Sequence, residues 1–161
     1  MIGIFMSSMR MKSIEGIHIG DRFSVSRTFS QQDAMEFAGI SRDYNPAHFD
    51  KRFSEAKNFK GKICHGLLVA SMITEIGGQV GWLATEMNFK FIKPVYFGEM
   101  IKCEMLITDI SPKGSAKAEA VFKNEEGTPV LRAFLKGIIP GESEKQVMRK
   151  MIEEGDPTNK I

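Results

Sequence analysis

The chain has 161 residues, of which 42% are hydrophobic and 26% charged, a balance typical of one globular domain with its own hydrophobic core. The formal net charge of +2 does not indicate a nucleic-acid-binding surface, and no apolar run reaches the roughly 20 residues that a membrane-spanning helix needs. Two separated cysteines on apolar patterns, Cys64 and Cys103, are expected to be reduced core residues. We therefore expect a cytoplasmic protein with no nucleic-acid or membrane partner and no metal site.

Three regions are expected along the chain. Residues 1–12 are rich in methionine and lack the basic segment followed by a long apolar run of a signal peptide, so they are interpreted as a flexible N-terminal segment. Residues 13–140 carry all the periodic patterns and are expected to form a single domain. Residues 141–161 form a charged tail, in which a helix over 143–154 is expected to be followed by disorder.

The first elements of the domain are a strand and a helix. Alternating apolar residues predict a strand over 21–29. Ser30 has the features of a helix N-cap, with Asp33 three residues later completing a variant of the capping box. The helix is expected to end at Gly39.

The next segment, residues 43–48, contains a carboxylate and an imidazole separated by a proline. Pro46 favours an extended Asn45, which is then an N-cap with Pro46 as the first helical residue. Asp43 on the incoming loop and His48 in the first turn can thus face one small volume that holds a water molecule. Such a pair suits general acid–base catalysis, and the helix N-terminus favours a neutral His48. The structural alternative is a turn in which Asp43 bonds its own backbone and His48 only packs.

Residues 63–76 are apolar on nearly every side and predict a buried helix that ends at Gly77 and Gly78. Gly66 in its first turn costs about 1 kcal/mol relative to alanine if helical. One explanation is that it lets a ligand approach exposed backbone N–H groups, which stabilise a developing negative charge. The other is that it only permits close packing against a strand. Nearby, His65 is expected to shape the loop rather than to act in catalysis.

From residue 87 onward the apolar period changes to two, which predicts an antiparallel meander with turns at 94–98, 111–114 and 125–128. An alanine row at 116, 118 and 120 leaves room for the buried helix. The predicted fold is α+β, a curved antiparallel sheet wrapped around one long central helix. Strands are predicted over 87–91, 101–108, 116–122 and 130–139.

Three blocks of sequence together resemble the MaoC-like, (R)-specific enoyl-CoA hydratases. They are residues 37–48 (FAGISRDYNPAH), 63–71 (ICHGLLVAS) and 88–99 (NFKFIKPVYFGE), and the resemblance spans about residues 15–140. Arg42 stands where many members of the family have glycine before the aspartate. The resemblance implies a hot-dog fold, a homodimer or higher homo-oligomer with its active site near the subunit interface, and no cofactor other than the coenzyme A of the substrate.

The resemblance also implies an activity, the interconversion of trans-2-enoyl-CoA and (R)-3-hydroxyacyl-CoA. Carried over by position, Asp43 and His48 would be the catalytic pair, Gly66 would donate its N–H to the thioester oxygen and Asn45 would help to order the site. From their position after Gly66, Ser71 and Thr74 are candidates for a hydrogen bond near the thioester, or for bonds back to helix carbonyls. Two other functions stay open: an acyl-CoA thioesterase, and a non-catalytic module that binds acyl thioesters.

Overall fold

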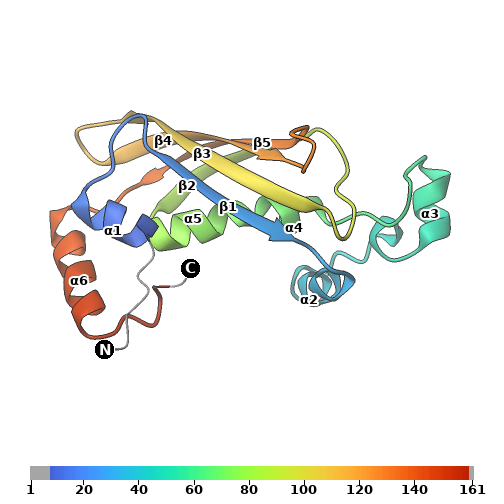
Figure 1. The fold of residues 1–161 in the computed structure, drawn as a ribbon, viewed down its shortest axis with the longest axis horizontal. Helices are drawn as coiled ribbons and strands as arrows, with labels where there is room; N and C mark the ends of the chain where they lie inside the picture. Colours follow the sequence, from blue (N-terminus) through green and yellow to red (C-terminus); the bar gives the residue numbers. More distant parts are fainter. Residues whose placement is uncertain (1–7, 160–161) are drawn as a thin grey trace.

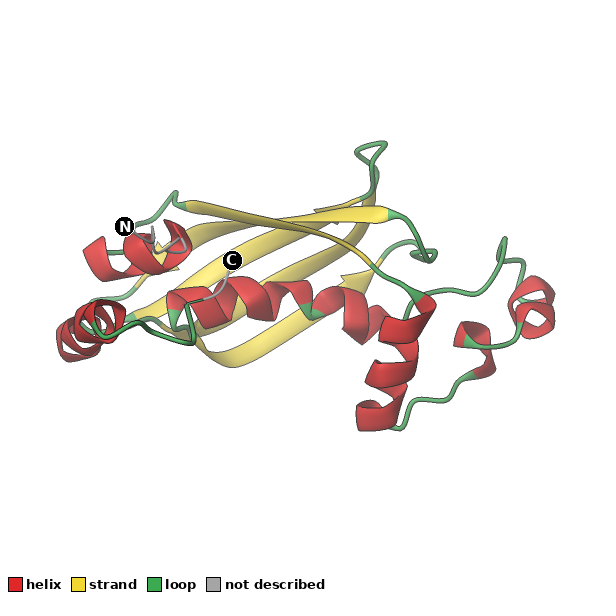
Figure 2. Cartoon of the chain, turned by 60° about the horizontal axis from the view of Figure 1, so that its bottom comes forward, coloured by secondary structure: helices red, strands yellow, loops and turns green. Residues whose placement is uncertain are grey.

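A computed structural model describes residues 8–159 of the chain. A five-stranded antiparallel sheet curves over a central helical segment, and none of the helices within residues 8–159 covers the opposite face of the sheet (Figures 1 and 2). The order of the strands across the sheet is β1-β3-β4-β5-β2. The predicted sheet around a helix is confirmed. The strands are β1 (Arg22–Thr28), β2 (Leu83–Phe91), β3 (Met100–Ile110), β4 (Ser115–Lys123) and β5 (Pro129–Ile138).

The strands do not form the simple meander that the sequence predicted. β3, β4 and β5 are successive neighbours, but β2 pairs with β5, from Leu83 opposite Ile138 to Phe91 opposite Leu131. The segment 92–99 is therefore a crossing connection to β3 and not a hairpin turn. Alternation of apolar residues shows which side of a strand is buried, but it does not show which strand is its neighbour.

The central helical segment consists of α4 (Gly66–Ala70) and α5 (Met72–Val80), with Ser71 between them. The predicted bounds were wrong at both ends, since the helical segment begins at Gly66 and continues through Gly77 and Gly78 to Val80, where Gly81 (φ 76°) is the C-cap. The apolar face of α5 packs in one core cluster with the inward face of the sheet, including two members of the alanine row. Burial of that face outweighs the helix penalty of the glycines. The buried α5 residues are Met72, Ile73, Ile76, Gln79 and Val80.

Helix α2 (Gln31–Ser41) has the predicted capping box, in which the Asp33 N–H donates to the Ser30 hydroxyl at 3.2 Å. It continues past the expected end at Gly39, because Arg42 adopts a left-handed conformation (φ 62°) and its N–H closes the last turn. After α2 come the short 3-10 helix η1 (Pro46–His48) and α3 (Lys51–Ala56). All three lie beyond one end of the sheet (Figure 1).

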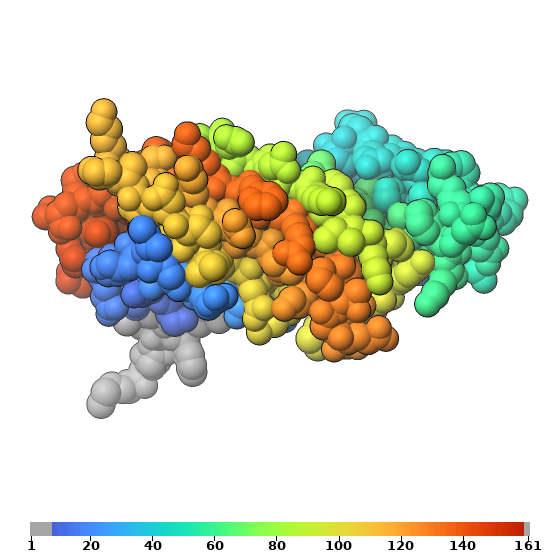
Figure 3. All heavy atoms as spheres, turned by 90° about the horizontal axis from the view of Figure 1, so that it is seen from above, coloured from blue at the N-terminus to red at the C-terminus, as the bar shows by residue number. Residues whose placement is uncertain are grey.

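Helices α1 (Ser8–Glu15) and α6 (Glu142–Glu153) lie together at the opposite end of the molecule (Figures 1 and 3). The predicted tail helix is confirmed, but two expectations need correction. Residues 8–12 of the expected flexible segment belong to α1, where Arg10 is buried and donates to the Gln79 carbonyl at 2.6 Å. Beyond α6, Asp156 is also ordered and accepts a bond from Arg10 at 2.7 Å. Residues 1–7 and 160–161 lie outside the described part of the chain.

Both cysteines are free and buried, as predicted. Burial is the main cause that raises the pKa of each thiol to about 12, so neither is a ready nucleophile. Among the helices between residues 8 and 159, none is long and apolar enough to cross a membrane.

Candidate active site

The corner between α2 and α3 has the local geometry that Pro46 predicted. Asn45 is extended (φ −56°, ψ 126°), and its side-chain oxygen accepts the Ala47 N–H at 3.0 Å. Pro46 begins η1, and His48 ends it. The structural alternative is also partly true, because the Asp43 side chain accepts the Asn45 N–H at 3.2 Å. That bond uses Oδ1, so Asp43 shapes the turn and still has Oδ2 available to accept another hydrogen bond.

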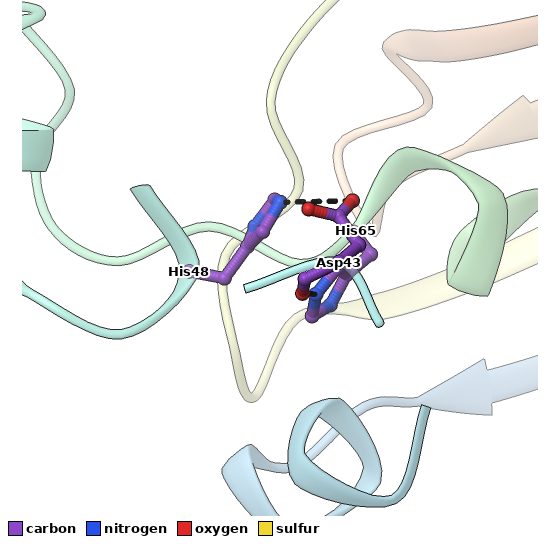
Figure 4. A group of neighbouring side chains, drawn as sticks. All are labelled: Asp43, His48 and His65. Atoms are coloured by element: carbon purple, nitrogen blue, oxygen red, sulfur yellow. Dashed lines mark hydrogen bonds and ion pairs between the residues drawn. The ribbon is translucent and has the colours of Figure 1, made fainter. Parts of the chain in front are cut away.

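The second oxygen of Asp43 faces His48. The Oδ2 atom lies 3.9 Å from Nε2 of His48. Figure 4 shows the two side chains pointing toward each other. This distance exceeds that of a direct hydrogen bond, and it suits one water molecule bonded to both groups. The Asp43 side chain is 49% exposed and that of His48 only 10%, so the pair lies where solvent meets the protein interior.

The other ring nitrogen of His48 determines its tautomer. Nδ1 lies 2.8 Å from the Ile63 carbonyl oxygen, which can only accept, so Nδ1 carries the proton. In the neutral ring, the lone pair is then on Nε2, facing Asp43. The pKa of His48 is lowered, mainly by burial, while the Ile63 carbonyl and Asp43 oppose the shift. The lowered pKa agrees with the expected preference for a neutral ring, and burial is its largest cause.

His65 lies against both members of the pair. Its ring stacks on that of His48 with centroids 3.8 Å apart and an interplanar angle of 28°. Its Nε2 lies 2.9 Å from the backbone carbonyl oxygen of Asp43, so Nε2 donates (Figure 4). The side chain is 1% exposed, and Nδ1 is buried without a hydrogen-bond partner among the described residues. The expected role in shaping the loop is consistent with these contacts.

A cavity of about 440 Å³ opens beside the pair, within the range of small-molecule sites. Its wall includes Asp43, His48 and Gly66, so the structure brings these three predicted residues to one space. A Cβ on Gly66 would lie 2.7 Å from the Phe91 ring, so the close-packing explanation of this glycine is confirmed. The two explanations are compatible, because Phe91 belongs to the same cavity wall.

Three predicted residues are not on this wall: Asn45, which caps η1 in the corner described above, and Ser71 and Thr74, which lie on the central helical segment. The Ser71 hydroxyl donates to the Leu68 carbonyl at 2.6 Å, and that of Thr74 donates to the Ser71 carbonyl at 2.6 Å. These are the bonds back to helix carbonyls that the sequence left open. Neither residue is on the wall of the cavity beside His48; Thr74 lines a second, smaller space of about 100 Å³ on the far part of α5.

Much of the cavity wall was not predicted as part of the site, although residues 91–95 lie in one of the three blocks that carry the family resemblance. It is apolar and comes from β2, the crossing segment and the start of β5, which meet only because β2 pairs with β5. Lys93 on the crossing segment adds a cation. Knowledge of the strand order would have been needed to find these residues. The wall residues contributed by these elements are Phe91, Ile92, Lys93, Pro94, Val95, Val130 and Leu131.

One group of described residues has the donor types of a transition-metal site. Ligand atoms of Asp43, His48 and His65 lie within 4.8 Å of one another. However, the two imidazole rings are stacked face to face and His65 Nε2 is engaged by the Asp43 carbonyl, so their free lone pairs do not converge without ring rotation. The geometry fits a water-binding acid–base pair better than a metal centre.

The sheet wrapped around a buried helix defines a hot-dog fold, and solved structures share it. The chain superimposes on the (R)-hydratase of A. caviae with a TM-score of 0.74 at 24% identity, over 78% of this chain and 99% of that one. In sequence, it is 32% identical over 103 residues to an (R)-specific enoyl-CoA hydratase of Rhodospirillum rubrum, which covers 62% of this chain and 72% of the relative.

A 3-hydroxybutyryl-CoA dehydratase of Methylorubrum extorquens is 24% identical over 94% of this chain and 93% of its own length. The family model of the MaoC-like domain matches residues 18–128, which contain the Asp43–His48 corner, Gly66 and four of the five strands. The chain belongs to the MaoC-like domain family.

Proposed function

We propose that the protein is an (R)-specific hydratase that adds water across the double bond of a trans-2-enoyl-CoA, or runs the reverse dehydration. The observation that carries this proposal is the pair of Asp43 Oδ2 and His48 Nε2, 3.9 Å apart at the edge of a largely apolar cavity. Binding an acyl group would need the cavity alone, whereas activating water needs the pair. Family relatives with hydratase and dehydratase names support the same reaction.

In the proposed reaction, a water molecule donates one hydrogen bond to Asp43 and one to His48 Nε2. Nε2 removes a proton as the water oxygen bonds to C3, and the electrons of the double bond move to form an enolate. The same proton then passes from Nε2 to C2, which restores the neutral ring and completes the addition of water. Asp43 orients the water and stabilises the transient imidazolium. The Nδ1 bond to Ile63 supports this assignment, because it leaves the Nε2 lone pair free.

The negative charge of the enolate develops on the thioester oxygen. Gly66 begins α4, and the first N–H groups of a helix have no partner within the helix. Because Gly66 is part of the cavity wall and has no side chain, we assign its N–H as the donor to that oxygen. Removal of one such donor costs about 3 kcal/mol in enzymes with comparable chemistry.

Incubation of the protein with crotonyl-CoA tests the proposal and separates it from the alternatives. Hydration removes the absorbance of the conjugated thioester without releasing thiol, and chiral analysis of the product should give the (R)-3-hydroxy form. Release of free thiol would identify a thioesterase instead. Tight binding of enoyl-CoA thioesters of every length without turnover would identify a binding module. Dialysis against EDTA should leave the hydration rate unchanged, because no step needs a metal.

The proposal includes a homodimer. β2 is an edge strand, and no other strand of the described part of the chain pairs with its outer side. Its residues Leu83, Met87 and Phe91 are 70%, 42% and 53% exposed. An apolar edge of this kind favours pairing with a second copy. Sedimentation equilibrium should give twice the monomer mass, and Met87→Lys should shift the protein toward the monomer.

A further inference from the structure

We propose that His65 is a positioning residue that holds Asp43 and His48 in their working geometry with a single side chain. The inference rests on the proposed hydratase function, because it assigns a role within that site. Its basis is geometric: one ring nitrogen of His65 bonds the backbone of Asp43, and the ring face lies on the imidazole of His48.

The bond to Asp43 fixes the loop that carries the carboxylate. His65 Nε2 donates to the Asp43 carbonyl at 2.9 Å, between residues 22 positions apart in the chain. This bond joins the loop before η1 to the start of α4, whose first residue is Gly66. The carboxylate that orients the water and the N–H that faces the thioester oxygen are therefore connected through one buried side chain.

The stack on His48 fixes the plane of the base. His48 is held at Nδ1 by the Ile63 carbonyl, a single bond about which the ring could still tilt. The ring of His65, 3.8 Å away, restricts that tilt and directs Nε2 toward Asp43. His65 is held in turn by aromatic contacts with Phe37 and Phe49, at centroid distances of 5.1 and 5.8 Å.

His65 also affects the proton affinity of His48. Four titratable side chains in the described structure face the cavity: Asp43, His48, Cys64 and Lys93. Burial and, to a smaller extent, the neighbouring His65 lower the pKa of His48, whereas the hydrogen bond with the Ile63 carbonyl and the charge of Asp43 raise it. Loss of the His65 imidazole should therefore raise the pKa of His48 where the replacement keeps His48 equally buried, as His65→Phe does.

Two substitutions separate the two contacts. His65→Gln places an amide N–H near the position of Nε2, so it keeps the donor to Asp43 but removes the ring. His65→Phe keeps a ring against His48 but removes the donor. We expect His65→Phe to lower kcat for crotonyl-CoA hydration by about 10-fold or more, since poor placement of catalytic groups is costly. His65→Gln should cause a smaller loss, and both should leave KM within about twofold.

A spectroscopic measurement tests the proposal without turnover. The chain has only three histidines, so the ring resonances of His48 can be assigned with the help of His18→Gln, a control at an exposed site. The titration midpoint of His48 should move to higher pH in His65→Phe, which keeps a ring over His48, and not in the control. The carbonyl ¹³C resonance of Asp43 should shift in His65→Phe and stay close to wild type in His65→Gln.

Failure of this inference can be distinguished from failure of the proposed function. If the wild-type protein does not hydrate enoyl-CoA, the proposed function fails, and the titration and carbonyl shifts still decide whether His65 positions the pair. The inference is overturned if folded His65→Phe keeps the His48 titration and the Asp43 carbonyl resonance of the wild type. It is also overturned if both variants lose kcat only in proportion to the loss of folded protein.

Discussion

Oδ2 of Asp43 and Nε2 of His48 lie 3.9 Å apart, although His48 follows Asp43 by five positions in the chain. On a continuous α-helix, that spacing would turn the two side chains well away from each other. The extended Asn45 and the 3-10 helix that begins at Pro46 bring them to one volume instead. The site therefore depends on a local backbone feature as much as on the two side chains.

Removal of either member of the pair should abolish most of the activity. Asp43→Asn keeps an oxygen for the Asn45 N–H but removes the charge, and His48→Asn keeps a donor near the Ile63 carbonyl but removes the base. We expect each to lower kcat for crotonyl-CoA by about 100- to 10,000-fold, the usual contribution of general acid–base groups. Circular dichroism should show an unchanged fold. The control Asp109→Asn, at an exposed carboxylate on β3, should keep full activity. Near wild-type turnover by a folded Asp43→Asn protein would remove the assignment.

The pH dependence should show the lowered pKa of His48. The base works only when its ring is neutral, so the acidic limb of kcat/KM should lie below 6.5, the ordinary value for histidine. The same shift affects stability. As the pH falls through 6.5 toward the folded-state pKa, the unfolded chain binds more protons at His48 than the folded one, so the free energy of unfolding falls. An acidic limb above 6.5 in the wild type would contradict this expectation.

Addition of a methyl group at Gly66 should disturb the cavity. The new Cβ would lie 2.7 Å from Cε1 of Phe91, so the ring must move away from the cavity wall. We expect Gly66→Ala to lower the free energy of unfolding by about 1–3 kcal/mol, in the range of overpacked sites, and to reduce the hydration rate. Urea unfolding and steady-state kinetics measure the two effects.

Two further variants serve as controls for Gly66→Ala. Gly39→Ala in α2 meets no heavy atom within 4 Å and should raise stability by up to about 1 kcal/mol. The double variant Gly66→Ala, Phe91→Leu removes the clash between the new Cβ and the ring, so it should recover stability. It should not recover activity if the added methyl group keeps the substrate thioester away from the N–H of residue 66. Full recovery of activity would instead mean that Gly66 serves packing alone.

The contact between Arg10 and Asp156 should stabilise the whole domain. The two side chains are 5% and 1% exposed, and Arg10 also donates to the carbonyls of Gly78 and Gln79 at the end of α5. We expect Asp156→Ala to lower the free energy of unfolding by about 1–3 kcal/mol, because charged hydrogen-bond partners are lost. Thermal unfolding measures this loss.

The pKa of Asp156 is also lowered, but for a different reason: its charged form is stabilised, whereas the charged form of His48 is destabilised by burial. Hydrogen bonds from Thr158 are the main cause that lowers the pKa of Asp156 below 3.8, and Arg10 adds to the shift. The stabilisation should therefore be complete above that value and disappear as the pH falls through the lower, folded-state pKa. Glu154→Gln, which breaks an exposed ion pair with Lys150, should leave the melting temperature nearly unchanged. An equal effect of the two substitutions would show that burial of the Arg10 contact adds nothing.

Local chemistry explains why the sequence alone predicted so much of this protein. Proline restricts the residue before it, an Asn side chain caps the next turn, and alternating apolar residues identify the buried side of a strand, all within a few positions. The capping box of Ser30 and Asp33, the corner at Asn45 and Pro46, and the sheet around a buried helix were therefore predictable.

The tertiary structure alone decided the features that depend on distant partners. The pairing of β2 with β5 brought Phe91 and Leu131 to the cavity wall, and no periodicity encodes that choice of neighbour. Helix α5 continues through Gly77 and Gly78 because burial of its apolar face in the core outweighs the low helix propensity of glycine. His65 reaches Asp43 across 22 positions, and Arg10 reaches Asp156 across 146, because packing brings buried donors to acceptors that the local sequence does not specify.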